Sequence, residues 1–221
     1  MQTRDLADSY PKVIFFDAMG TLFGLRGSVG EVYGQVAQQF GVEVSAPDLD
    51  RAFLQCFKAA PAMAFPGVAQ SELLQRESDW WEAIARQTFH EAGVLQQFQD
   101  FSIFFAYLYA YFTTAEPWQL YPDTIPTLQF WQNQGIELGI ISNFDSRLHP
   151  ILRILGLSRY FASVTISTEA GAAKPESAIF RQGLAKHGVR PDQAWHVGDS
   201  IKADYQGARA AGLTGIWLDR R

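Results

Sequence analysis

Four short segments of the chain place polar side chains directly after apolar runs. The first, Asp17-Ala18-Met19-Gly20-Thr21, follows the run Val13–Phe16. A carboxylate held at the end of a buried strand, beside a glycine turn, can attack phosphorus or carbon and form a covalent ester. The alternative is that Asp17 only caps a turn. Taken alone, the segment favours the turn cap.

The second and third segments carry groups that could bind an anion. Ser142-Asn143 ends the apolar run 136–141, and both side chains could donate hydrogen bonds to phosphoryl or carboxylate oxygens. Asp145 is predicted to be the N-cap of the next helix. Lys174 comes at a loop-to-helix junction before Pro175. It could neutralise an attacking carboxylate and an anionic substrate together, or it could be a solvated surface lysine.

The fourth segment, Gly198 to Asp204, holds two carboxylates that follow a glycine. Asp199 and Asp204 could bind a hard divalent cation through oxygen. Alternatively, Asp199 caps the turn and Asp204 lies on the surface of a helix. Arg26, just past the first segment, could reach a substrate anion or could be solvated.

Alternating strand and helix patterns must position these segments. Such alternation implies a parallel sheet covered on both faces, with ligands at the carboxyl ends of the strands. The four segments should therefore meet at one edge of the sheet. The predicted strands cover residues 13–16, 136–141, 162–166, 194–197 and 215–218, and the helices between them cover 124–134, 146–155, 175–187 and 203–211.

Residues 28–114 interrupt this pattern with helices alone. Ser28 and Glu31 form a capping-box pattern at the start. Further helices are predicted over 73–90 and 98–112. The sequence thus predicts an α/β domain with an all-helical insertion after its first strand. We expect the aromatic residues of the insertion to form core, with a pocket lining as the alternative; they are Trp80, Trp81, Phe104, Phe105, Tyr107, Tyr109 and Tyr111.

The amino-acid composition excludes several classes of protein. The 221 residues are 48% hydrophobic, which excludes a disordered chain, and 18 Lys+Arg against 23 Asp+Glu leave a net charge of −5. An acidic chain is a poor general binder of nucleic acid. The single cysteine, Cys56, excludes an internal disulfide. Residues 1–11 lack the apolar core of a signal peptide. The most hydrophobic segment, residues 101–112, is too short to span a bilayer. We expect a soluble, cytoplasmic protein with no membrane partner, in an oligomeric state that the sequence leaves open.

The order and strand-end placement of the four segments resemble the haloacid dehalogenase (HAD) superfamily of hydrolases. The resemblance covers nearly the whole chain, and Phe65-Pro66-Gly67 and Trp80-Trp81 resemble the haloacid dehalogenase-like hydrolase domain-containing branch. It implies a Rossmann-like parallel sheet core made of residues 1–23 and 118–221. It also implies a helical cap domain, residues 24–117, inserted after the first strand.

The resemblance also implies roles for the candidate residues. Asp17 would be the nucleophile, Ser142 would hold the transferring group, and Lys174 would orient and neutralise it. Asp17, Asp199 and Asp204 would hold Mg²⁺. The reaction would be phosphoryl transfer to Asp17 and then to water, with a phosphate ester of a small molecule as substrate.

Met19 departs from the pattern of the superfamily's phosphatases, in which this position is a second aspartate that protonates the leaving group. A thioether has no proton to give, although the carbonyl of Met19 could still bind Mg²⁺. Losing a general acid costs about 10²–10⁴ in rate, so we expect slow turnover. Thr21, Asn143 and Arg26 complete the predicted set as substrate-binding residues.

Two alternatives stay open. A 2-haloacid dehalogenase releases halide, needs neither a proton donor nor a metal, and also lacks an acid at the position of Met19. However, Asp199 would repel Asp17 unless a cation lay between them, which favours a metal site. The second alternative is a weakly catalytic or non-catalytic protein that binds a phosphate ligand.

Overall fold

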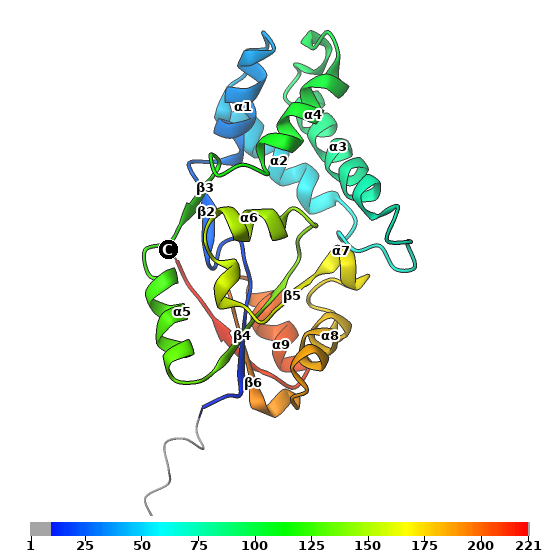
Figure 1. The fold of residues 1–221 in the computed structure, drawn as a ribbon. Helices are drawn as coiled ribbons and strands as arrows, with labels where there is room; N and C mark the ends of the chain where they lie inside the picture. The colour runs from blue at the N-terminus through cyan, green and yellow to red at the C-terminus, as the bar shows by residue number, and fades with distance from the viewer. Residues whose placement is uncertain (1–9, 221) are drawn as a thin grey trace, which may run out of the picture.

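The computed structural model describes residues 10–220, so the expectation about the first eleven residues falls largely outside it. Five parallel strands form one sheet in the order β5-β4-β1-β6-β7 (Figure 1). The predicted α/β fold, with a parallel sheet and a helical insertion after the first strand, is confirmed. The strands are β1 (Val13–Phe16), β4 (Glu137–Ser142), β5 (Ser163–Ile166), β6 (Ala194–Gly198) and β7 (Thr214–Trp217).

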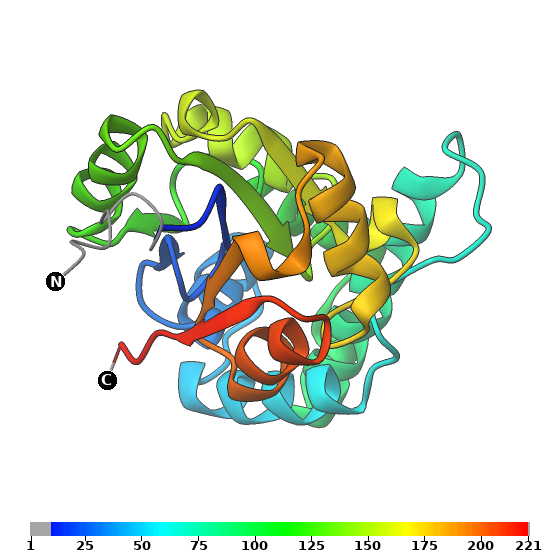
Figure 2. The ribbon, with the colours of Figure 1, turned by 90° about the horizontal axis from the view of Figure 1, so that it is seen from below.

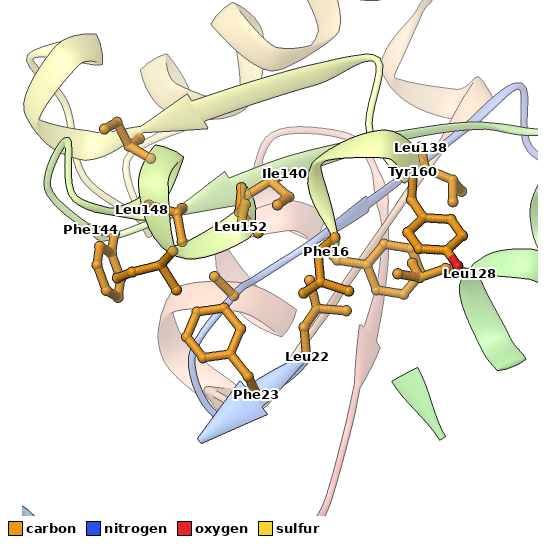
Figure 3. Close-up of a cluster of buried hydrophobic side chains, with 14 of the residues drawn as sticks. Phe16, Leu22, Phe23, Leu128, Leu138, Ile140, Phe144, Leu148, Leu152 and Tyr160 are labelled. Carbon is orange, nitrogen blue, oxygen red and sulfur yellow. The ribbon is translucent and has the colours of Figure 1, made fainter. Parts of the chain in front are cut away.

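Helices cover both faces of the sheet because its central strand is apolar on both sides (Figure 2). Ile14 and Phe16 of β1 pack under α5 (Thr124–Asn133) and α6 (Leu148–Ile154). The intervening Val13 and Phe15 pack under α8 (Ser177–His187) and α9 (Gly207–Ala210). The side chains alternate between faces with the period of two that a strand imposes. Figure 3 shows the first of these two clusters, in which Leu128 of α5 and Leu148 of α6 lie on either side of Phe16.

The insertion forms a separate group of helices above the carboxyl edge of the sheet (Figure 1). Ser28 accepts from the backbone of Glu31, and the Glu31 side chain accepts from the backbone of Ser28, so the predicted capping box is confirmed. Phe104 and Phe105 are buried in the core of these helices, whereas Tyr107 is exposed. The helices are α1 (Val29–Gln39), α2 (Ala46–Ala59), α3 (Leu73–Glu91) and α4 (Phe101–Tyr111).

A two-stranded antiparallel ribbon connects the insertion to the sheet domain. It pairs β2 (Phe23–Leu25) with β3 (Trp118–Leu120). The sequence does not reveal this ribbon because strands of three residues are too short to show an alternating pattern. The chain enters the insertion through β2 and returns to the sheet domain through β3. The exact domain limits, between residues 23 and 24 and between residues 117 and 118, stay a prediction.

Three further elements differ from the sequence-based expectation. The helix predicted from Pro175 begins at Ser177, because Glu176 has extended backbone at the N-cap. The helix predicted over 203–211 is a π-helical turn (Ile201–Gln206) followed by α9. A short helix, α7 (Ser167–Ala170), was not predicted. Single 3₁₀ turns lie at Leu95–Gln97, Ser158–Tyr160 and Pro191–Gln193. Within residues 10–220, every helix is too short or too polar to cross a membrane.

Candidate active site

Asp17, Ser142 and Lys174 come together at the carboxyl edge of the sheet. Asp17 follows β1 directly, Ser142 ends the neighbouring strand β4, and all three residues are buried. Ser142 Oγ donates to Asp17 Oδ1 over 2.8 Å, and Lys174 Nζ donates to the same oxygen over 2.6 Å. Among the described residues, Asp17 Oδ2 accepts no hydrogen bond, so one carboxylate oxygen is fixed and the other stays available.

Asn143 fixes the backbone of the loop that carries Lys174. Its amide nitrogen donates to the Lys174 carbonyl over 2.9 Å, and its amide oxygen accepts from the Lys174 N–H over 2.7 Å. Both ends of the amide are therefore engaged, although the side chain lines the cavity. Its predicted role in substrate binding stays a prediction, and the contact it makes here positions Lys174.

Asp204 is buried and fully engaged. Its Oδ1 accepts from Lys174 Nζ and from His196 Nε2, the latter over 2.8 Å, and its Oδ2 accepts from the Ser200 N–H over 2.9 Å. Burial alone would raise the pKa of Asp204, but the bond from His196 and the charge of Lys174 hold it well below its usual range. Asp204 is therefore ionised and does not simply lie on a helix surface.

His196, on β6, is fully buried. However, it also touches the site through Asp204. Since a carboxylate only accepts, Nε2 carries the proton, and Nδ1 has no partner among the described residues. Burial lowers the pKa of His196, so the ring is neutral. No pattern in the sequence could have revealed this contact, because the π-helical turn is what brings Asp204 to it.

Asp199 lies at the exposed rim of the same site. Burial of part of its carboxyl group, with the charges of Asp17 and Asp204 adding to it, raises its pKa to about 6. The turn at Gly20 leaves room for it: Gly20 has φ +85°, and a Cβ there would lie 2.6 Å from Asp199 Oδ2. Glycine at this position therefore serves both the left-handed backbone and the close approach of Asp199.

The three carboxylates could hold a metal ion. One oxygen each of Asp17, Asp199 and Asp204 lies within 4.8 Å of the others. Carboxylate oxygens are the donors that hard cations such as Mg²⁺ prefer. Lys174 forms ion pairs with two of these carboxylates, Asp17 and Asp204. Burial alone would lower the pKa of Lys174, but the charges of Asp17 and Asp204 outweigh burial and raise it. Three carboxylates beside one ammonium leave excess negative charge, which a divalent cation would neutralise.

The remaining predicted residues lie in different positions. Met19 is 41% exposed and lines the cavity of about 590 Å³ that contains Asp17, Lys174 and Asp199. Thr21 is buried below the turn, and Arg26 is exposed; neither side chain lines that cavity. Their proposed contacts with substrate stay predictions.

The expectation that Asp145 is an N-cap is wrong. Arg147 holds the N-cap position of α6, and Asp145 is completely buried. Asp145 accepts from Arg147 Nε over 2.8 Å and from Trp81 Nε1 over 2.7 Å. It thus joins the cap helix α3 to the sheet domain, a long-range contact that local sequence does not reveal.

Comparisons with known proteins identify the family of the chain. The family model for "haloacid dehalogenase-like hydrolase" matches residues 11–212. The chain is 37% identical over 202 residues to haloacid dehalogenase-like hydrolase domain-containing protein 3 of Bos taurus, covering 91% of this chain and 79% of the relative.

Two solved structures share the fold. A HAD phosphatase from Thermococcus onnurineus is 27% identical with a TM-score of 0.61, covering 95% of this chain and 87% of that one. The L-2-haloacid dehalogenase from Xanthobacter autotrophicus is 22% identical with a TM-score of 0.67, covering 96% of this chain and 78% of that one. The same fold thus occurs in a phosphatase and in a dehalogenase.

Proposed function

The chain belongs to the haloacid dehalogenase-like hydrolase family, and from that premise we propose that it is a Mg²⁺-dependent phosphatase of small phosphate esters that acts through a phosphorylated Asp17. The observation that carries this proposal is the arrangement around Asp17. Ser142 and Lys174 hold Oδ1, while Oδ2 accepts no hydrogen bond from residues 10–220 and would be the attacking atom. Asp199 and Asp204 contribute carboxylates beside it.

The reaction would have two steps. In the first, Oδ2 of Asp17 attacks phosphorus, the bond from phosphorus to the ester oxygen breaks, and its electron pair leaves with that oxygen. In the second, water attacks phosphorus and loses a proton to solvent, the bond from phosphorus to Oδ2 breaks, and its electron pair returns to Asp17, which releases phosphate and restores the carboxylate. Lys174 keeps the nucleophile oriented and offsets negative charge, and Ser142 could donate to a phosphoryl oxygen during transfer.

The residues that would hold Mg²⁺ are Asp17, Asp199 and Asp204 together with the carbonyl of Met19. When bound, the ion would offset the carboxylate charge and polarise the phosphoryl oxygens. Because both oxygens of Asp204 already accept hydrogen bonds, Asp204 also fits a supporting role that orients Lys174.

A dehalogenase is the second candidate, and Met19 is the observation that favours it, because halide departs without a proton. Asp199 argues against it: burial, together with the charges of Asp17 and Asp204, raises the pKa of this carboxyl, and without a cation among them the three like charges would repel one another. Chloride release from 2-chloropropionate in the presence of a chelator would support this candidate. Tight binding of a phosphate ligand with no turnover of any ester would instead support the non-catalytic alternative.

The test is phosphate release from an aryl phosphate with and without Mg²⁺. The parent protein should release phosphate only with the metal, and Asp17→Asn should abolish release. Asp192→Asn is the matched control, because Asp192 is an exposed aspartate that pairs with Arg190 away from the site. Equal rates for the parent and Asp17→Asn would remove Asp17 as the nucleophile.

A further inference from the structure

An apolar cavity of about 220 Å³ lies between the cap and the sheet domain, beside the candidate active site. Its walls come from the cap helices, the β2–β3 ribbon, α6 and the loops after β1 and β4, and they are almost entirely aliphatic or aromatic. It shares six lining residues with the cavity that contains Asp17, so the two spaces adjoin. The shared residues are Met19, Leu25, Val29, Phe57, Trp81 and Phe144.

The cavity offers no free charge to a ligand. Arg147 is the one charged residue among the described side chains that line it. Both oxygens of the buried Asp145 accept from its guanidinium, over 2.8 and 2.7 Å, and the guanidinium carbon lies 3.8 Å from the centre of the Tyr109 ring. Burial raises the pKa of Tyr109 and of Tyr33, which keeps both phenols neutral. The space therefore suits a neutral apolar group.

The size of the cavity suits one ring. A cavity of about 150 Å³ lined by aliphatic and aromatic side chains stays dry and binds benzene. The cavity here, at about 220 Å³, is large enough for a single aromatic ring with a small substituent.

The position and chemistry of Met19 also favour an aromatic leaving group, independently of the size of the cavity. Its side chain lines both spaces, so it lies between Asp17 and the apolar cavity. A thioether donates no proton, so Met19 favours an ester whose oxygen can leave as an anion. A phenol has a pKa of about 10, whereas an alkyl alcohol is close to water at about 15.7, so a phenolate leaves far more readily.

On the basis of the proposed function, we propose that the substrate is the phosphate monoester of a phenol whose single ring occupies this apolar cavity. Oδ2 of Asp17 bonds to phosphorus, the bond from phosphorus to the phenolic oxygen breaks, and the electron pair stays on that oxygen. The phenolate then takes a proton from solvent. The cavity and Met19 thus select the same leaving group, one by shape and the other by chemistry.

Three probes separate the two parts of this proposal. Phenyl phosphate has both the ring and the good leaving group. Cyclohexyl phosphate has a similar shape but a poor leaving group. Acetyl phosphate has a good leaving group and no ring. With Mg²⁺, kcat/KM for phenyl phosphate should exceed that for cyclohexyl phosphate at least about 100-fold, the scale on which a missing general acid is felt. Equal values for these two esters would overturn the leaving-group argument.

Filling the cavity tests where the ring binds. Leu108→Phe, on α4, and Ile151→Phe, on α6, enlarge buried side chains that line the apolar cavity only. Each should lower kcat/KM for phenyl phosphate about tenfold or more, the scale of one lost apolar group. Turnover of acetyl phosphate should be unchanged, which also shows that the variant is folded. Leu74→Phe, at a 66% exposed position, is the matched control. A loss that is equal for both substrates, or no loss, would overturn the proposal.

A binding measurement separates failure of this inference from failure of the proposed function. In Asp17→Asn with Mg²⁺, calorimetry should show phenyl phosphate binding about tenfold tighter than inorganic phosphate, a difference that Leu108→Phe removes. Tighter binding without turnover in the parent would contradict the phosphatase and keep the ring site. Equal binding of the two ligands would overturn the ring site whether or not the protein hydrolyses esters.

Discussion

The ammonium nitrogen of Lys174 lies 2.6 Å from Oδ1 of Asp17, although 157 residues separate the two along the chain. Their side chains are only 2% and 10% exposed, so this ion pair is made in the interior. Lys174 also pairs with Asp204, which places one buried cation between two buried carboxylates. The ionised form of Lys174 therefore stabilises the ionised forms of Asp17 and Asp204, and these two carboxylates stabilise the charge of Lys174 in turn.

Lys174→Met should lower both activity and stability. It leaves Asp17 and Asp204 buried without their cation, and breaking such a pair costs about 3–5 kcal/mol. Denaturant unfolding should show that loss in metal-free protein and a smaller loss with Mg²⁺, which would replace part of the missing charge. Lys58→Met, at an exposed position of α2, is the control and should change little. A metal-free loss under about 1 kcal/mol would contradict the charge balance described here.

Gly20→Ala should weaken Mg²⁺ binding. The new Cβ would lie 2.6 Å from Asp199 Oδ2 and would push that carboxylate away. Gly41→Ala is the matched control: Gly41 also has positive φ, at +76°, but no atom outside its chain neighbours lies within 4 Å of the added Cβ. Both variants should lose about 1 kcal/mol of stability from the strained backbone. Only Gly20→Ala should lose Mg²⁺ affinity in a titration, and equal affinities in the two variants would contradict this prediction.

The raised pKa of Asp199, about 6, predicts how stability depends on pH. Because ionising this carboxyl is unfavourable in the folded state, its contribution is fully present below the ordinary pKa and is lost as the pH rises through about 6. Metal-free Asp199→Asn should therefore be more stable than the parent at about pH 8, by about 1 kcal/mol after solvent screening, and the difference should shrink below about pH 6.

Mg²⁺ should reverse that order. Binding requires the ionised form of Asp199, so the rise in Tm caused by Mg²⁺ should be larger at about pH 8 than at about pH 5. Thermal unfolding with and without the metal measures both effects. A metal-induced shift that is the same at both pH values, or the same in Asp199→Asn, would contradict a role for Asp199 in binding the ion.

Hydrogen bonds to Glu77 should stabilise the contact between the cap and the sheet domain. This fully buried residue of α3 accepts from the Ser146 N–H over 3.0 Å, from the Ser146 hydroxyl, and from Thr168 Oγ1 over 2.5 Å. Glu77→Ala leaves both Ser146 donors without this acceptor and should cost about 1–3 kcal/mol. Hydrogen exchange in α3 should become faster. Glu82→Ala, which removes the pair with Arg86 on the same helix, should cost under about 0.5 kcal/mol. Equal effects would show that Glu77 does not anchor the cap.

Met19→Asp should restore a proton donor. Turnover of alkyl phosphates should rise, by up to about 10²–10⁴, because the new carboxyl could protonate the leaving oxygen. Turnover of aryl phosphates should rise less, since a phenolate needs no proton to leave. The ratio of the two rates is the measurement. An unchanged ratio would mean that the missing acid is not what limits the reaction.

The convergence of the site could be predicted from the sequence because it follows from topology. Parallel strands end at one edge of a sheet, so Asp17 and Ser142, each at a strand end, had to meet. The engagement of Asn143 with the Lys174 backbone could not be predicted, since an amide suits a ligand and a loop equally well.

Contacts between the cap and the sheet domain also could not be predicted from the sequence. Asp145 fits a local cap by type, and only the packing of α3 on the sheet domain brings Trp81 to it. The contact of His196 with Asp204 depends on the wider π-helical turn, for which the sequence carries no signal. The residues that tie elements together over long range were therefore the ones that local patterns assigned incorrectly or incompletely.

The most direct test of the central claim is to trap the phosphorylated enzyme. Protein mixed with phenyl phosphate and Mg²⁺ is quenched in acid within one turnover, digested, and analysed by mass spectrometry. We expect a phosphoryl group on Asp17 in the parent protein and none in Asp17→Asn. Phosphate release by the parent with no phosphoryl group on Asp17, or with the group on another residue, would contradict it.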